Sequence, residues 1–527
     1  MQALWPVSEA DWSTIYQKVT QAGLLPGRSV RERLLELPDI DRLVDAAKAI
    51  GKKGILDESA LDALLIEMEP KPAKNTDKVV ARTIAPVSTP EPTTAARIHD
   101  LDHYKLADFP MNAKDLDSEI NVHFDITGKS VTEGKKEDIN SCFSNRLKQI
   151  RKMILDGGLP NRPISANDAV RQRRRFSTSD DTCTIIGLVN GPRTTKNGHL
   201  IFSIEDNSGE LTCLLSQRDE ESENQEIVHA GLMPDDVIGV SGHFSQTGDL
   251  FYCENLHFPP LNQHQRRSSG EDQAVSAAFI SDLHLGSKTF LESQWHKMIR
   301  WFNEDPLAQT IRYLVISGDG VDGVGIYPGQ EKELNISDLF NQYSRLGEML
   351  QELPDWVDVL LLPGNHDAVR PAEPQPALDP ELQTDYNNTI FVGNPCDFSL
   401  HGVRVLSYHG VSIMDFVSSL RTVTFEKPEA AMRAMIDRRH LAPSWGGKTP
   451  LSPEPEDRLV ISDIPDIFVT GHVHGHHTEN YKGVNLVHSS TWQDQTSYQR
   501  MLGFQPKPCI LTVVNLHTHA TASIPFV

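Results

Sequence analysis

The 527-residue sequence lacks the features that mark secreted, disulfide-linked and membrane-spanning proteins. Its six cysteines form no CxxC pair, which argues against a zinc ribbon and a disulfide framework. No apolar run reaches the ~18 residues of a membrane span. The N-terminus "MQALWPVSEADW" has no basic segment followed by an apolar one, so it does not read as a secretory signal. These absences predict a cytoplasmic protein that does not associate with a membrane.

Basic residues are also in deficit. Lysine and arginine total 50 against 72 aspartates and glutamates, which gives a formal net charge of −22. A charge of this sign repels phosphate backbones at long range. We therefore expect any binding of nucleic acid to depend on local basic residues, on metal ions or on a partner. The length of the chain predicts two to four domains.

The first 177 residues divide by composition. Residues 1–69 are predicted to form a small helical docking domain, in which "DIDRLVDAAKAIG" places its apolar residues on one helical face. Residues 70–100 are rich in proline and threonine and are predicted to be a flexible linker. Residues 101–177 are predicted to be a helical connecting segment, because "EDINSCFSNRLKQIRKMILDGG" has apolar residues at helical spacing before a Gly-Gly stop.

The next region, residues 178–262, changes to β-rich runs. Five of them, "CTIIGLVN", "HLIFSIED", "ELTCLLS", "DVIGVSGHF" and "LFYCENLHF", are separated by turn sequences. Five short strands of this kind favour an oligonucleotide-binding (OB-fold) barrel. Such a barrel binds single strands through a basic face with aromatic side chains, for which Arg193, Lys196, Phe202 and Tyr252 are the candidates. The alternative is that both aromatic rings belong to the barrel core and that the barrel docks a protein.

Residues 263–527 alternate apolar strands with helical patterns, which is typical of an α/β layered domain. The strands are "AVSAAFI", "YLVIS", "VDVLLLP", "VRVLSY" and "DIFVT", and each is followed directly by residues that bind metals. In chain order these are Asp282 and His284, then Asp319, then Asn365, His366 and Asp367, then His409, and finally His472 and His474. Because ligands bind beyond the strand ends of such sheets, the shared position predicts a binuclear metal site.

The order DxH, GD, GNHD, H and GHxH resembles that of the calcineurin-like metallophosphoesterases. Longer stretches resemble the small subunits of archaeal D-family DNA polymerases, among them "SGDGVDGVGIYPGQ", "LLPGNHDAVRPAEPQPAL" and "SSTWQDQTSYQRMLGFQPKP". The resemblance covers residues 120–527 and includes "FDITGKSV" and the barrel run "IFSIEDNSGELTCLL". It implies a multidomain chain with a small helical N-terminal domain, an oligonucleotide-binding β-barrel and a metallophosphoesterase domain.

The resemblance also implies a metal ligand set. One ion would be held by Asp282, His284 and His474, and the other by Asn365, His409 and His472. Asp319 would bridge the two ions, since a carboxylate has two oxygens and neutralises two cations at once. Mixed oxygen and imidazole ligands suit Mn²⁺ better than Mg²⁺, although Mg²⁺ remains an alternative.

The residues around the ligands receive roles from the same resemblance. His366 would protonate the departing 3′ oxygen or stabilise the transition state, and Asp367 would orient His366. Tyr327 and Arg370, together with Lys196 of the barrel, are candidate contacts to nucleic acid. Asp322 is expected in a loop or supporting position and not among the ligands.

The implied reaction is metal-dependent hydrolysis of the phosphodiester at a DNA 3′ end, which is 3′→5′ exonuclease proofreading. The implied partners are a large catalytic polymerase subunit and a primer-template or single-stranded 3′ end, with the sliding clamp and primase as further candidates. Two other functions remain open. One is a scaffold without catalysis, which is disfavoured because all seven ligand positions are filled. The other is a stand-alone phosphatase or cyclic-nucleotide phosphodiesterase, which would not account for the barrel.

Overall fold

A computed structural model describes residues 112–527 apart from 179, 218–224, 262, 274 and 502, together with short pieces of the first 61 residues. The chain divides into two compact units, Met1–Glu91 and Pro92–Val527. In the first unit, β1 (Leu24–Pro26) pairs in parallel with β2 (Gly54–Leu56), a sheet that the helical prediction omitted. The predicted helix at "DIDRLVDAAKAIG" and the predicted linker lie outside the described residues. Within the described residues, no helix has the length and apolar character of a membrane span.

The predicted five-stranded barrel is confirmed as a closed barrel with the strand order β4-β5-β6-β8-β7. Its strands are β4 (Cys183–Thr194), β5 (Leu200–Asp206), β6 (Gly209–Leu215), β7 (Val237–Phe244) and β8 (Phe251–His257), with α8 (Gln225–Ala230) between β6 and β7. All neighbouring strands are antiparallel except β6 and β8, which pair in parallel and close the ring. Alternate side chains point inward and fill the barrel with apolar residues.

In the described part of the second unit, two α-helices and one strand precede the barrel. The predicted helix is confirmed as α6 (Lys136–Asp156), whose apolar side packs on the barrel, and α7 (Ala166–Arg171) leads into β4. The strand β3 (Ile120–Phe124) differs from the expected helical segment, since it pairs with β13 of the layered domain. Its three central side chains are exposed, so its local sequence has no buried face that would have identified it.

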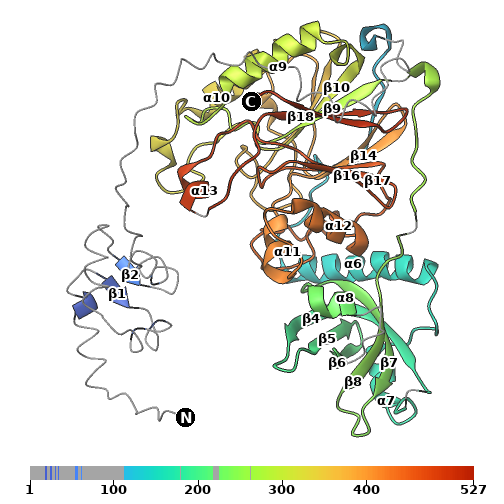
Figure 1. Ribbon diagram of the computed structural model, residues 1–527. Coiled ribbons are helices and arrows are strands. Elements are labelled where there is room, and N and C mark those ends of the chain that lie inside the picture. The colour runs from blue at the N-terminus through green and yellow to red at the C-terminus, as the bar shows by residue number, and fades with distance from the viewer. Residues whose placement is uncertain are drawn as a thin grey trace, which may run out of the picture. The chain divides into compact units, whose positions relative to one another are not determined.

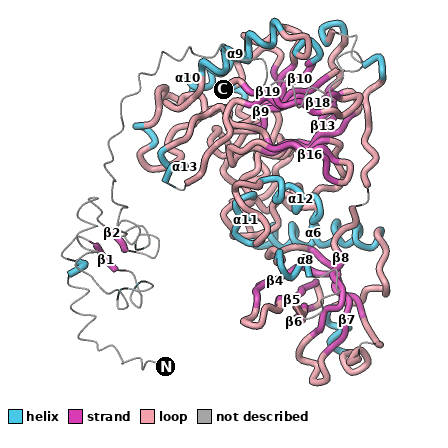
Figure 2. Tube along the Cα trace, in the orientation of Figure 1, coloured by secondary structure: helices cyan, strands magenta, loops and turns pink. Residues whose placement is uncertain are grey.

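The rest of the chain forms two six-stranded sheets (Figures 1 and 2). The first has the order β12-β11-β10-β9-β18-β19, with β9 (Ser276–Ile280), β10 (Ile311–Ser317), β11 (Asp358–Leu362), β12 (Thr389–Phe391), β18 (Ile510–Asn515) and β19 (Thr521–Pro525). The second has the order β16-β17-β15-β14-β13-β3, with β13 (Cys396–Leu400), β14 (Val403–Ser407), β15 (Ile467–Thr470), β16 (His477–Tyr481) and β17 (Val484–His488).

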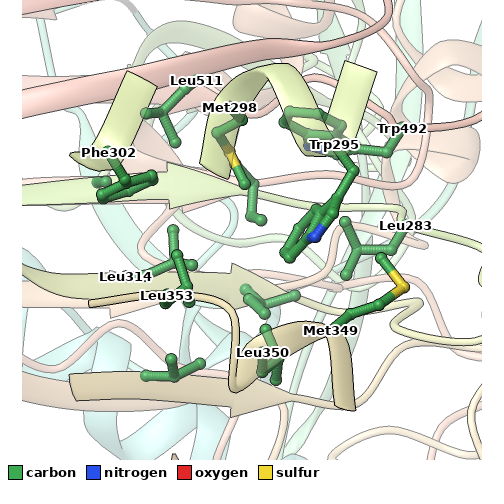
Figure 3. Close-up of a cluster of buried hydrophobic side chains, with 14 of the residues drawn as sticks. Leu283, Trp295, Met298, Phe302, Leu314, Met349, Leu350, Leu353, Trp492 and Leu511 are labelled. Carbon is green, nitrogen blue, oxygen red and sulfur yellow. The ribbon is translucent and has the colours of Figure 1, made fainter. Parts of the chain in front are cut away.

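The two sheets face each other across a shared apolar core, and helices cover their outer faces. Along β10, Tyr313 and Val315 point into the core between the sheets, whereas Leu314 and Ile316 point toward the helices. Figure 3 shows this outer cluster, in which α9 (Glu292–Glu304) and α10 (Leu339–Leu350) pack on the first sheet. The helices α11 (Ile413–Ser419) and α12 (Pro428–Arg438) pack on the second. Burial on both faces explains why these strands are continuous apolar runs.

Strand direction positions the site. β9, β10 and β11 run parallel in the first sheet, and β14 and β15 run parallel in the second. The carboxyl ends of parallel strands meet at one edge of a sheet. Each of the five loops that carry the predicted ligands begins at such a carboxyl end.

Candidate metal centre

The five loops bring the predicted ligands into two neighbouring groups that could each hold an ion. The ligand atoms of Asp282, His284 and His474 lie within 4.8 Å of one another, and so do those of Asp319, His409 and His472. These two groups match the predicted division between the ions, apart from Asn365 and the bridge. A third group of the same compactness joins Asp319 and His284 to His366. Asp319 and His284 therefore lie between the second group and the first.

Five of the predicted ligands have a strained backbone. Asp282, His284, Asp319, His472 and His474 have φ between 50° and 72°, in the left-handed region. Residues other than glycine adopt this region at a cost of about 1–3 kcal/mol each and persist there only when the surrounding structure holds them. Such strain gathers at sites where side chains must be aimed, which supports a functional interpretation of these loops.

In the first group, the possible ligand atoms of three side chains lie close together. The Nε2 atoms of His284 and His474 lie 3.1 Å apart, and His474 Nε2 lies 3.3 Å from Asp282 Oδ1. This Oδ1 atom is buried and has no hydrogen-bond partner among the described residues. A buried carboxylate oxygen without a donor is costly in the absence of a cation. The donor set therefore fits a bound cation.

The second group is arranged around His409 and Asp319. His409 Nε2 lies 3.2 Å from Asp319 Oδ2 and 3.1 Å from Asn365 Oδ1. His409 Nδ1 donates to the carbonyl oxygen of Ser317 at 2.9 Å, which leaves Nε2 as the atom that faces Asp319 and Asn365. His284 is oriented in the same way, because its Nδ1 lies 3.0 Å from Asp322 Oδ1. Fixing one ring nitrogen by a hydrogen bond frees the other to bind metal.

Charge is balanced inside the site by the imidazoles. Burial disfavours the charged imidazolium of His284, but the carboxylates of Asp282, Asp322 and Asp319 outweigh it and raise its pKa to about 10. Burial is likewise outweighed at His409, where Asp319 and Asp282 raise the pKa to about 10. In return, against burial, the neighbouring histidines hold the pKa values of Asp282 and Asp319 below their usual range. The carboxylates therefore favour positive charge on their neighbours, and a bound cation would supply that charge in place of the ring protons.

His366 lies at the rim of the two groups with its side chain 18% exposed. Its Nδ1 donates to the carbonyl oxygen of Asp322 at 2.9 Å, and its main-chain amide donates to Asp319 Oδ1 at 2.8 Å. Its ring packs edge-on against His284 with 4.6 Å between centroids. The remaining ring atom, Nε2, is left for a ligand or substrate.

Asp367 does not orient His366, which differs from the sequence-based expectation. Its carboxylate accepts hydrogen bonds from the main-chain amides of Gly364 and Gly320, at 2.8 and 3.2 Å, and from the Tyr343 hydroxyl at 3.0 Å. Burial, followed by the charge of Asp319, raises the pKa of Asp367 to about 6. Asp367 therefore ties the GNHD loop to the loop of Asp319 and to α10, while Asp322 holds the imidazole.

The comparisons with known proteins agree on one family. A family model that describes the B subunits of DNA polymerases alpha and epsilon matches residues 277–479. The DNA polymerase II small subunit of Archaeoglobus fulgidus is 38% identical over 401 residues, which are 74% of this chain and 77% of that protein. The protein of the same name from Halobacterium salinarum is 35% identical over 450 residues, 84% of this chain and 86% of that one. The chain belongs to the archaeal DNA polymerase II small subunits.

A third member of the family, from Methanocaldococcus jannaschii, is 36% identical over 420 residues, 77% of this chain and 68% of that protein. The resemblance to D-family small subunits noted in the sequence is thereby confirmed. Among solved structures, an archaeal phosphodiesterase aligns over 47% of this chain and 99% of that one, at 12% identity and a TM-score of 0.25.

The candidate DNA contacts differ in how exposed and how free their side chains are. Arg370 donates to Pro374 O, Ser130 Oγ and Glu454 Oε1, so the structure engages its guanidinium within the protein. Phe202 is 2% exposed and belongs to the barrel core, so for this ring the core alternative is the one that the structure supports. Tyr252 is 40% exposed, and Lys196 is exposed. Tyr327 is 38% exposed, and its hydroxyl donates to Glu333 at 2.8 Å.

Sequence reasoning missed the residues that support the ligands through side-chain amides. Gln330 Nε2 donates to Asp322 Oδ2 at 2.9 Å, and Gln493 Nε2 donates to Asp322 Oδ1 at 3.3 Å. Gln499 of α13 (Ser497–Met501) lies with Nε2 2.8 Å from His474 Nδ1. A glutamine has no chemistry that singles it out in a sequence, so only the two quoted stretches that contain these residues hinted at them.

Proposed function

We propose that the chain is the nuclease subunit of an archaeal DNA polymerase and hydrolyses the phosphodiester at a DNA 3′ end with the help of two divalent ions. The observation that carries this proposal is the pair of ligand groups around Asp319, with His366 at their rim. A single imidazole beside two cation sites suits phosphoryl transfer, where charge must be stabilised on several oxygens at once. The proposed outcome is 3′→5′ removal of nucleotides as 5′-monophosphates, which is proofreading.

The proposed ligands follow the two groups. Asp282, His284 and His474 would hold one ion, Asn365, His409 and His472 the other, and Asp319 both. Ions bound there would supply Lewis acidity to the phosphate oxygens and a nucleophile at neutral pH. The mixture of imidazole and oxygen donors favours Mn²⁺, with Mg²⁺ as the alternative.

The imidazole of His366 would act on the leaving oxygen. Its Nδ1 hydrogen is held by the Asp322 carbonyl, so a proton given to the 3′ oxygen must come from Nε2. Water adds to phosphorus, the bond from phosphorus to the 3′ oxygen breaks, and that oxygen leaves as a hydroxyl. Fixing Nδ1 keeps the ring in one orientation, which is what a positioned general acid needs.

The family name supports a partner for this activity. Polymerisation would belong to a large catalytic subunit that assembles with this chain, and the DNA substrate would be a primer-template or a single-stranded 3′ end. The sliding clamp and primase are further candidate partners. We also propose that the closed barrel is an oligonucleotide-binding fold, because its strand order with a parallel closing pair is compatible with that five-stranded Greek-key barrel.

The test is hydrolysis of a primer with a mismatched 3′ end, with Mn²⁺ or Mg²⁺, by the wild type and by His366→Ala. We expect a ~10²–10⁴-fold loss of kcat in the variant, the range for removing a general acid. His517→Ala is the matched control, since His517 contacts Asn515 and Ser269 outside the site. If the wild type releases no nucleotide with either ion, alone and with the large subunit, the nuclease proposal is wrong and a scaffold role is favoured.

A further inference from the structure

A cluster of arginines stands out in this acidic chain. Residues 162–176 contain five arginines and one aspartate, whereas the whole chain has a net charge of −22. Four of the arginines are exposed: Arg171 is the last residue of α7, and Arg173, Arg174 and Arg175 lie in the turn that follows it. We call these four residues the arginine turn. They lie apart from the metal centre in the sequence and belong to none of its ligand groups.

The arginine turn is held in a fixed conformation against the barrel. The amide of Arg175 donates to Gln172 O at 2.8 Å, and the amide of Phe244 in β7 donates to Phe176 O at 2.6 Å. The stem of Arg173 lies on Gly248 in the β7–β8 hairpin, so closely that a Cβ on that glycine would fall 2.8 Å from Arg173 Cδ. Figure 1 shows α7 near the end of the barrel where β7 and β8 lie. The guanidinium groups are therefore presented from an ordered surface.

The positive charge of the turn is left largely uncompensated. Arg171 lies 4.0 Å from Asp168, and both side chains are exposed, which makes this a weak pair. In the part of the chain that the structure describes, Arg173, Arg174 and Arg175 make no ion pair. Residues three and four apart in a helical turn share a face, so Arg171 lies on the side of Arg174 and Arg175, and like charges repel there. A polyanion would relieve this repulsion.

The neighbouring strands add an exposed aromatic surface. Tyr252 of β8 is 40% exposed and contacts the ring of His243 in β7, with 5.6 Å between centroids. Tyr252 is four residues from Gly248, the residue on which Arg173 lies, so the Cα atoms of Tyr252 and Gly248 are at most about 14 Å apart. Cationic groups beside an exposed ring are the elements by which proteins bind single-stranded nucleic acid, through phosphates and base stacking. Duplex DNA offers no free base faces to such a ring.

We propose that the arginine turn and Tyr252 form a second nucleic-acid site, which binds single-stranded DNA outside the metal centre. The arginines bind phosphates, and Tyr252 stacks on a base. The inference rests on the proposed function in taking DNA as the ligand of this chain. A local basic site of this kind would let the acidic protein bind a single strand that its net negative charge repels at long range.

The test measures binding of a fluorescein-labelled oligothymidylate to the full chain in EDTA, where no metal-dependent hydrolysis occurs. One variant replaces all four arginines with glutamine (Arg171→Gln, Arg173→Gln, Arg174→Gln and Arg175→Gln). With ~0.7 per phosphate contact on single strands, we expect the slope of log K against log salt to fall by about 2–3. Tyr252→Leu should weaken binding ~5- to 150-fold, the range for one stacked base, and leave the salt slope unchanged.

The matched control removes four exposed lysines elsewhere by Lys114→Gln, Lys135→Gln, Lys136→Gln and Lys427→Gln. An equal loss in the control would mean that total charge and not the arginine turn sets the affinity, which overturns the inference. Unchanged DNA binding in the arginine variant also overturns it, and loss of the large subunit in the same variant would then identify a protein-docking surface.

Hydrolysis of bis(p-nitrophenyl) phosphate with Mn²⁺ separates this inference from the proposed function. That small diester reaches the metal centre without the barrel, so the arginine variant should hydrolyse it as the wild type does. A wild type that binds oligothymidylate through the turn but hydrolyses neither diester nor DNA would contradict the nuclease proposal alone.

Discussion

His366 donates a hydrogen bond from Nδ1 to the main-chain carbonyl of Asp322 at 2.9 Å. The carboxylate of the same aspartate lies 3.0 Å from Nδ1 of His284, a predicted metal ligand. One residue therefore orients two imidazoles with different proposed tasks, one through its main chain and one through its side chain. A side-chain substitution should therefore disturb the ligand and keep the main-chain hydrogen bond that orients the proposed general acid, while Asp322 Oδ1 lies farther away, 4.0 Å from His366 Nδ1.

Asp322→Asn should weaken metal binding more than it slows the reaction at saturating metal. The amide is a poorer acceptor for His284 Nδ1–H, and losing such a supporting carboxylate costs ~10–100-fold in metal affinity. The carbonyl that holds His366 is unchanged by the substitution. Titration of nucleotide release with Mn²⁺ measures both quantities, and Asp338→Asn at the N-terminus of α10 is the matched control. A drop in kcat that excess Mn²⁺ does not restore would contradict this assignment.

Tyr343→Phe should destabilise the site through Asp367. The Tyr343 hydroxyl donates to the buried Asp367 Oδ1 at 3.0 Å and accepts from the amide of Ala368 at 2.8 Å. Removing it leaves that partly buried amide and part of the buried carboxylate unsatisfied, at a cost of ~1–3 kcal/mol. Denaturant unfolding of the metal-free protein measures the loss.

The control for that prediction is Tyr386→Phe, which removes the hydroxyl that donates to the carbonyl of Tyr343 at 2.8 Å. We expect about 0.5–1.5 kcal/mol there, the usual net worth of one hydrogen bond. Equal losses in the two variants would show that the Asp367 contact has no special weight.

The sequence predicted five strands of the layered domain, the five-stranded barrel and the residues that lie together at the candidate metal centre, because apolar runs that end in polar residues are a local pattern. Runs such as "YLVIS" are apolar throughout since both faces of β10 are buried, and polar residues begin where the strand ends. The roles of supporting residues were not predictable. Asp367 accepts hydrogen bonds from Tyr343 and Gly320, whereas Asp322 contacts His284. These partners are distant in the sequence, and only the packing of the folded chain brings them together. β3 was missed for the same reason, since its pairing with β13 is distant in sequence.

The unfolding free energy should fall in two stages as the pH is lowered. Both stages come from groups that lie near Arg146 of α6, namely His440 and Asp457. Burial, followed by the charge of Arg146, lowers the pKa of His440 below its usual 6.5. The unfolded chain then binds a proton that the folded one does not, so stability is lost as the pH falls below about 6.5. Arg146 and His440 outweigh burial and hold the pKa of Asp457 below its usual range. That carboxylate's contribution is present above about pH 4 and is lost below it.

His440→Gln should flatten the first stage and leave the second. Each proton taken up on unfolding changes stability by ~1.4 kcal/mol per pH unit, so the difference between variant and wild type should appear between about pH 6.5 and 5. Urea unfolding at pH 7.5, 5.5 and 4.5 checks it, with the exposed His229→Gln as a control. Parallel pH profiles for the variant and wild type would mean that His440 is not the titrating group.

Arg146→Met should be among the most destabilising single substitutions in the chain. Arg146 is 2% exposed; its Nε donates to Asp457 at 2.7 Å, and one terminal nitrogen donates to the carbonyls of Pro443 and Asp235. Removing the guanidinium leaves a buried carboxylate without its cation, which costs ~3–5 kcal/mol. Asp457→Asn in the same chain removes that charge, so the double variant should recover part of the loss in urea unfolding. A double variant as unstable as the sum of the two single ones would mean that the ion pair is not the source of the cost and that the carbonyl contacts of Arg146 are.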